Sequence, residues 1–249
     1  MNLKLKTAIS SSNVLKDISL SALEDDTVRK YRIYHEDIRM SNSFTTQDKE
    51  QYLQRIGAAK ISAIDGKVHP TEAGLLMFGK ETQIRSIFPN YSLEYEHREY
   101  WHLVNKDILL DCIKTGSGDW SGNLFDFYLL IVNKLTIDLK VPFKLNGMQR
   151  IENTPLHDIV RGTFVNCLAC ANYKHSGVMV ANRFESVVYK SDNLQTEDSN
   201  CRAKAIWKLF KLLKFGYSDP SLKQPMVEER EEQGKHIVTV WKQGEKFLY

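Results

Sequence analysis

From residue 91 to residue 241, segments with a helical period of apolar side chains and segments with a strand period follow one another. Apolar side chains recur at helical spacing in three segments, which predict helices at residues 123–135, 156–171 and 203–213. Apolar and polar side chains alternate in four short segments, which predict strands at residues 91–97, 178–181, 186–189 and 236–241. This intermixing of helices and strands predicts an α+β fold.

The first half follows a different order of elements. After a polar, helical lead-in, a capping-box sequence at residues 45–48 predicts a helix, and alternation around Asp65 and Gly66 predicts a tight hairpin. An apolar helix over residues 73–79, closed by glycine, is expected next. Helix, hairpin and helix in this order are also typical of a winged helix. The last helix has no row of Arg, Asn or Gln for base edges, so a structural role is favoured.

Composition excludes several classes of protein. The 249 residues are 42% hydrophobic and 26% charged, which is ordinary for a globular domain and excludes disordered and collagen-like chains. The 34 basic and 31 acidic residues leave a net charge of +3, too small to indicate a protein that coats nucleic acid or a membrane surface. No apolar run is long enough to span a bilayer, and no secretory signal is readable, so we expect a cytoplasmic protein without a membrane partner.

Four cysteines are present, two of them as a C-x-x-C at Cys167 and Cys170. This pair lies in an apolar helical pattern without a second C-x-x-C, so both are interpreted as small core residues rather than as a redox or zinc site. The histidines show no ligand spacing, and no metal is expected. The glycine-containing turn at residues 116–123 lacks the sequence of a phosphate-binding loop and is interpreted as loop geometry.

Four segments carry a resemblance to a known family. TEAGLLMFGK at residues 71–80 looks like "T-x-A-G-L-L-L-F-G-K", and GDWSGNLFDFY at residues 118–128 looks like "G-x-W-x-G-N-L-x-D-F-Y". TPLHDIVRGTFVNCLACANY at residues 154–173 is similar to a helix containing "R-E-A-L-V-N-x-L-x-H-A-D-Y", and the closing helix, "P-x-L" and strand follow at residues 205–241. The chain therefore resembles the RecG-like C-terminal, or divergent AAA/AlbA-type, family of bacterial and archaeal transcriptional regulators.

The resemblance implies a GHKL (Bergerat) fold, as in gyrase, Hsp90 and histidine kinases, and it implies where a nucleotide would bind. In such domains a helix carries a Glu that activates water and, four residues on, an Asn that binds Mg²⁺ bridging the ATP phosphates. Asn166 stands at the Asn position, but the Glu position is Gly162. Arg161 resembles the family's Arg beside that Glu. We expect Arg161 to form an ion pair or to cap a neighbouring element rather than to contact phosphate.

Other family positions also differ in this chain. Cys170 and Asn172 replace a His and an Asp, and Ser191-Asp192-Asn193 stands where the family has "N-P-G". About ten residues, none of them glycine, separate Asn193 from Ala205. That segment is too short to wrap a triphosphate with backbone N–H groups. Either the lid is lost or a disordered stretch is missing from the sequence.

We therefore expect an N-terminal α/β region at residues 1–95 and a degenerate GHKL-like α/β sandwich at residues 96–249. The favoured function is that of a transcriptional-regulator fragment that has lost ATP hydrolysis. It would have no catalytic residue and no cofactor, and it would act through a protein partner, a homo-oligomer, or DNA bound by an upstream AlbA-type domain outside this chain.

Two alternatives remain open. The first is a functional ATP-binding domain in which Asn166 and Arg161 hold Mg²⁺–ATP, with Asp158 or Glu152 as the replacement acid. The second is a direct DNA-binding module that uses residues 45–80 as a winged helix.

Overall fold

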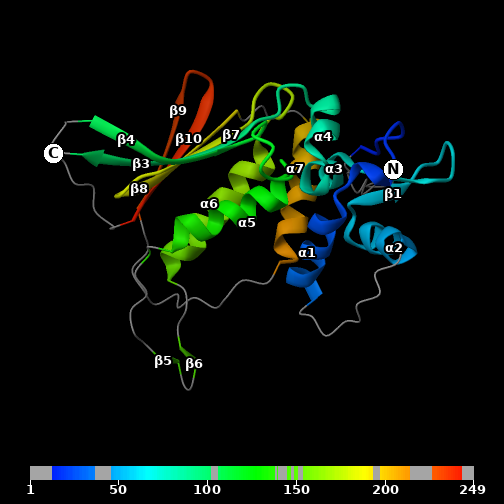
Figure 1. The fold of residues 1–249 in the computed structure, drawn as a ribbon, viewed down its shortest axis with the longest axis horizontal. Coiled ribbons are helices and arrows are strands. Elements are labelled where there is room, and N and C mark those ends of the chain that lie inside the picture. The colour runs from blue at the N-terminus through cyan, green and yellow to red at the C-terminus, as the bar shows by residue number, and fades with distance from the viewer. Residues whose placement is uncertain are drawn as a thin grey trace, which may run out of the picture.

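The computed structural model contains a six-stranded mixed sheet with helices on one face (Figure 1). It describes residues 13–36, 46–101, 106–137, 139, 145–146, 149–150, 154–192, 197–213 and 226–242. The sheet order is β4-β3-β7-β8-β10-β9, in which β3 and β7 are parallel and every other pair is antiparallel. The α+β class is therefore confirmed.

The strands of this sheet come from three parts of the chain. Their bounds are β3 Leu93–Trp101, β4 Lys106–Lys114, β7 Val178–Asn182, β8 Ser186–Ser191, β9 Val227–Glu232 and β10 Lys235–Trp241. The four strands expected from alternation are confirmed as β3, β7, β8 and β10. Strands β4 and β9 were not expected. The predicted boundary between residues 95 and 96 falls inside β3.

Three helices pack beside the sheet or against one another: α5 Leu124–Thr136, α6 Pro155–Cys170 and α7 Glu197–Lys211. Tyr189 on β8 is fully buried and donates a hydrogen bond to the carbonyl of Val160 on α6, which fixes α6 over the sheet. Helix α7 begins at Glu197, six residues before the start at residue 203 that the apolar spacing predicts. Residues 197–202 carry no apolar period that would indicate this earlier start.

The N-terminal elements form a layer beside these helices. They are η1 Leu20–Ala22, α1 Asp25–Glu36, α2 Thr46–Ile56, β1 Ala59–Ile61, β2 Val68–Pro70, α3 Glu72–Phe78 and α4 Glu81–Ile87. Strands β1 and β2 pair antiparallel, and a further short pair consists of β5 Leu145–Asn146 and β6 Gln149–Arg150. Buried side chains from both halves form one continuous core, which includes Phe78 of α3 and Phe125 of α5.

Helix α3 is the centre of the N-terminal layer. Thr71 caps it by accepting a hydrogen bond from the amide of Gly74, and all seven of its residues are buried. A Cβ on Gly74 would lie 1.9 Å from the carbonyl oxygen of Ala58, so only glycine permits this close approach to the residue before β1. The side chains of α3 therefore pack in the core and are not available to contact base edges. This burial argues against a winged helix in which α3 binds DNA.

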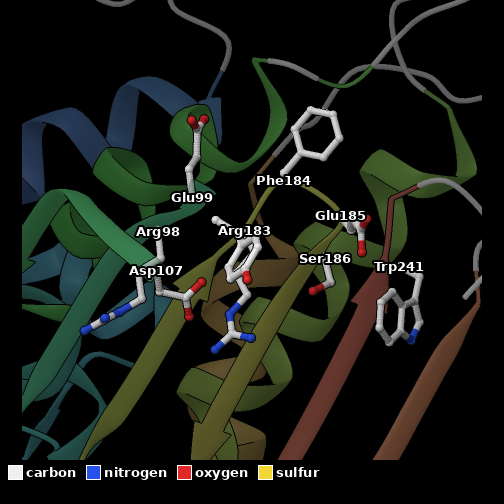
Figure 2. A pocket seen from close by; sticks show the side chains of 9 residues that line it. Arg98, Glu99, Asp107, Arg183, Phe184, Glu185, Ser186 and Trp241 are labelled. Atoms are coloured by element: carbon white, nitrogen blue, oxygen red, sulfur yellow. The ribbon is translucent and has the colours of Figure 1, made fainter. Parts of the chain in front are cut away.

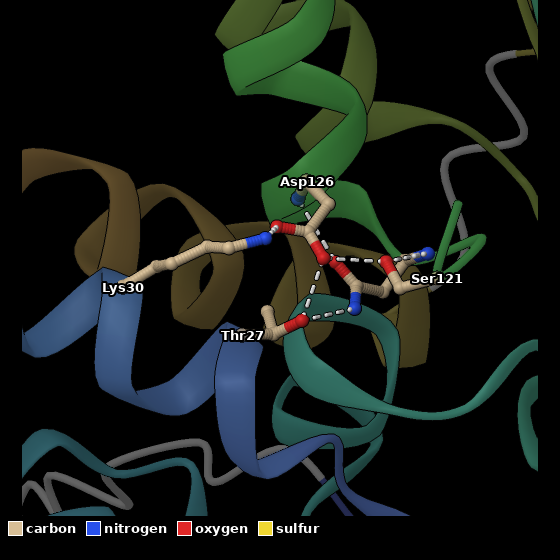
Figure 3. Close-up of polar contacts among 5 residues, drawn as sticks. Thr27, Lys30, Ser121 and Asp126 are labelled. Atoms are coloured by element: carbon tan, nitrogen blue, oxygen red, sulfur yellow. Dashed lines mark hydrogen bonds and ion pairs between the residues drawn. The ribbon is translucent and has the colours of Figure 1, made fainter. Parts of the chain in front are cut away.

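The glycine-containing turn before α5 serves to attach α1 (Figure 3). Asn123 caps α5 by accepting from the amide of Asp126 at 2.9 Å, and its Nδ2 donates to Thr27 of α1 at 3.1 Å. The carboxylate of Asp126 accepts hydrogen bonds from Thr27 and Ser121, each at 2.6 Å, and pairs with Lys30 at 3.4 Å. This network is a structural junction, in agreement with the interpretation of the turn as loop geometry.

Candidate functional site

Helix α6 carries the residues that the family resemblance singles out. Pro155 lies in its first turn, and the Nδ1 of His157 accepts a hydrogen bond from the amide of the cap residue Thr154 at 3.1 Å. Burial lowers the pKa of His157, and the guanidinium of Arg161 one turn away lowers it further. The neutral imidazole can therefore act as the acceptor that the start of the helix requires.

Asp158, Gly162 and Asn166 lie one turn apart along the same face of α6, because their spacing of four residues is close to one helical turn. This face lines a cavity of about 370 Å³ between α6 and α7. Arg161 lines the same cavity. The structure thus brings together Arg161, Gly162, Asn166 and the replacement acid Asp158, whereas Glu152 lies outside the described residues.

The amide oxygen of Asn166 is engaged by the neighbouring helix. Trp207 of α7 donates its indole Nε1–H to Asn166 Oδ1, with the two atoms 3.0 Å apart. The ammonium of Lys211, one turn along α7, lies 3.7 Å from the centre of the Trp207 ring in a cation–π contact. Sequence reasoning did not find Trp207 or Lys211, because nothing in the pattern of α7 indicates which residue of α6 it will contact.

The rest of the cavity wall is largely apolar. Tyr128, Val165, Phe210 and Leu213 line it beside the polar groups. Burial raises the pKa of the Tyr128 phenol, which stays protonated at neutral pH. Arg161 and Lys211 supply two positive charges against the single carboxylate of Asp158.

The residues present do not fit Mg²⁺–ATP in the way that the resemblance implies. Gly162 has no side chain to activate water, although a Cβ there would meet nothing within 4 Å. Asp158 lies two turns from Asn166, which is roughly 12 Å along the helix axis and twice the one-turn spacing that the resemblance implies between the acid and the Asn. Within the described ranges, no group of three or more His, Cys, Asp or Glu could hold a metal ion.

Of the two family positions at the end of α6, Asn172 has structural partners and Cys170 is exposed. The amide of Asn172 donates to the carbonyl of Asp192 at 2.8 Å, and its side-chain oxygen accepts from the amide of Lys174 at 3.3 Å. Cys167 is buried, as expected, and burial raises its pKa to about 12. The expectation for Cys170 is wrong, because it is exposed at the last turn of α6, where the helix face turns away from the core.

A second, larger cavity of about 730 Å³ lies at one end of the sheet (Figure 2). Side chains from β3, β4, β10 and the turn between β7 and β8 line it, among them Arg98, Asp107, Phe184 and Trp241. Arg98 donates to Glu96 at 2.6 Å, and this contact lowers the pKa of that carboxyl. Sequence reasoning missed this cavity, because its residues are distant in sequence and share no motif.

Comparisons with known proteins support the fold but name no activity. Residues 4–94 match the profile of a family described as "Domain of unknown function (DUF8451)". No curated protein sequence matches the chain. A solved structure, that of the DIP2311 protein from Corynebacterium diphtheriae, is similar with a TM-score of 0.60 and 12% identity over 94% of this chain and 47% of that chain. At this identity the likeness shows the fold alone, and this chain spans about half of that protein's length.

Among the described residues, no helix is both long and apolar enough to cross a bilayer.

Proposed function

We propose that this chain is a GHKL-like module of a cytoplasmic transcriptional regulator that acts through binding contacts and does not turn over ATP. DNA would be bound by another domain of the full protein, and this module would contact a protein partner or a second copy. The observation that carries the proposal is the hydrogen bond from Trp207 Nε1 to Asn166 Oδ1 at 3.0 Å. In this contact the indole of Trp207 engages the amide oxygen of Asn166 that, according to the resemblance, would bind Mg²⁺.

Two further features support this proposal. The position of the water-activating acid is Gly162, and the nearest carboxylate on the same face of α6 is one turn further away from Asn166. The apolar cavity wall provides Tyr128 and Phe210 rather than a set of oxygen ligands. A cavity of this kind suits contact with an apolar or aromatic group better than it suits a hydrated triphosphate.

The test is a pair of assays on the purified chain with Mg²⁺ present. We expect ATP hydrolysis at the rate of the buffer alone, and no Mg²⁺-dependent binding of a fluorescent ATP analogue at micromolar concentration. Asn166→Ala is the matched variant. Micromolar, Mg²⁺-dependent binding that this substitution abolishes would overturn the proposal in favour of an ATP-binding domain.

A gel-shift assay at about 0.1 M salt addresses direct DNA binding. A module whose DNA contacts reside elsewhere in the protein should give no shift. A shift that weakens steeply as salt rises would identify a direct DNA binder, since phosphate contacts by basic side chains release counterions. That outcome would also contradict the proposal.

A further inference from the structure

The two edges of the six-stranded sheet differ sharply in charge. One edge is β9, where Glu228, Glu229, Glu231 and Glu232 surround a single arginine. Such a strand repels a second copy of itself, which is one way that proteins protect an exposed edge. The other edge is β4, whose two lysines and two aspartates balance in charge, so it does not repel a second copy in this way.

Strand β4 is long and exposes apolar side chains. Its nine residues read KDILLDCIK, and Leu109 and Leu110 at its centre are 46% and 52% exposed. In the part of the chain that the structure describes, no strand pairs with its outer side. A long apolar edge of this kind is a template for pairing with another strand.

A bulge decides which side chains of β4 share a face. Asp111 lies opposite His97 while Leu109 lies opposite Arg98, so Leu110 is an extra residue in the strand. The alternation therefore shifts by one position at Leu110. Asp107, Leu109, Cys112 and Lys114 point to one face of the sheet, since their partners on β3 are all on that face.

We propose that two copies of this chain pair antiparallel through β4, so that their sheets join edge to edge across a two-fold axis. In this register Asp107 lies opposite Lys114 of the second copy, and Leu109 lies opposite its Cys112. Directly opposed residues of antiparallel strands point to the same face, and the shift at the bulge makes both pairings satisfy this condition.

The chemistry of the opposed side chains supports this register. The two-fold axis generates two Asp107–Lys114 pairs of opposite charge, and between them Ile108 lies opposite Ile113 on the other face. Moving the strand by two positions preserves the faces but places Asp107 opposite Cys112 and Ile108 opposite Asp111. That alternative loses the two Asp107–Lys114 charge pairs, whereas both registers set an apolar side chain opposite Asp111.

A charge-swap experiment tests the pairing in solution. Sedimentation equilibrium of the full chain should show a reversible dimer. Asp107→Lys should raise the dimer dissociation constant at least about ten-fold, because two attractive pairs become repulsive. Adding Lys114→Asp to the same chain should restore dissociation to within about three-fold of the original. Both side chains are exposed, so neither substitution should disturb folding.

Cysteine cross-linking tests the register itself. Leu109→Cys would place a thiol opposite Cys112 of the second copy, with the two Cβ atoms about 5 Å apart, within reach of a disulfide under a mild oxidant such as diamide. Ile108→Cys is the matched control, because that side chain points to the opposite face. Covalent dimer is expected for Leu109→Cys at a rate well above both Ile108→Cys and the unmodified chain.

Two outcomes would overturn this inference. One is a chain that remains monomeric at all accessible concentrations and shows no enhanced cross-linking with Leu109→Cys. The other is a dimer that neither responds to Asp107→Lys nor distinguishes the two cysteine variants. The inference does not depend on the nucleotide question, so these results are independent of the ATP assays.

Discussion

The indole of Trp207 and the amide oxygen of Asn166 form a hydrogen bond of 3.0 Å that joins the middle of α6 to α7. Asn166 itself is exposed, and Trp207 retains 38% of its accessible surface. A double-mutant cycle with Asn166→Ala and Trp207→Phe measures the bond directly. We expect a coupling free energy of about 0.5–1 kcal/mol from urea unfolding, at the lower part of the range because water competes for both groups. Strictly additive single and double variants would contradict this contact.

Asp126 is the shared acceptor between α1 and α5. Asp126→Ala leaves the hydroxyls of Thr27 and Ser121 without the oxygen to which both donate. We expect a loss of about 2–4 kcal/mol in the free energy of unfolding, because the buried hydroxyl of Thr27 and the half-buried hydroxyl of Ser121 both lose their acceptor.

Lys30→Ala is the matched control for the charged part of the same network. Its ammonium lies 3.4 Å from Asp126, and the Lys30 side chain is 55% exposed. We expect a change of less than about 0.5 kcal/mol in the same urea titration. An effect of Lys30→Ala as large as that of Asp126→Ala would mean that the ion pair, and not the hydroxyl contacts, maintains the junction.

Two helical glycines provide a contrast in packing. An alanine Cβ at Gly74 would lie 1.9 Å from the carbonyl oxygen of Ala58, whereas at Gly162 nothing lies within 4 Å. Gly74→Ala should cost about 2–4 kcal/mol of unfolding free energy, because the backbone of Ala58, just before β1, must move. Gly162→Ala should gain about 0.5–1 kcal/mol from helix propensity. Thermal unfolding of both variants checks this, and equal shifts of the two melting temperatures would refute the close approach of α3 to β1.

His69 on β2 joins the start of the chain to the β1–β2 hairpin. Its Nδ1 lies 2.8 Å from the carbonyl of Ile18 and its Nε2 lies 2.8 Å from the carboxylate of Asp65. Both partners are acceptors, so both ring nitrogens donate when the imidazole is protonated, and these contacts favour the protonated form. The Ile18 carbonyl and then the Asp65 carboxylate raise the pKa of His69, and His69 lowers the pKa of Asp65 to about 2.

The sign of the resulting pH dependence follows from this raised pKa. The stabilisation by His69 is fully present below its unfolded pKa of about 6.5 and is lost as the pH rises through the higher folded value. Urea midpoints of the natural chain and of His69→Asn should therefore converge as the pH increases from about 5.5 to about 8.5. A difference in midpoint that stays constant over this range would show that His69 does not titrate in this way.

Local pattern determined much of the fold. The helical spacing of apolar side chains predicted α5 and α6, and the alternation of apolar and polar side chains predicted β3, β7, β8 and β10. Asn123 marked the start of α5. These features depend on residues near one another in sequence, where helical and strand periodicities act directly. The same reasoning missed β9, because its run of glutamates shows no alternation and becomes a strand by pairing with β10.

Only part of the candidate site could be predicted from the sequence. The spacing of Gly162 and Asn166 on one helix face follows from helical geometry, and the absence of a carboxylate at Gly162 can be seen in the sequence alone. That Trp207 meets Asn166, and that β4 forms an edge of the sheet with a bulge at Leu110, depends on how distant segments pack. The sequence by itself determined the helical or strand periodicity of each segment and the side chains available for contacts. Only the tertiary structure decided which of them meet, because contacts between segments far apart in the chain arise from the joint burial of several faces at once.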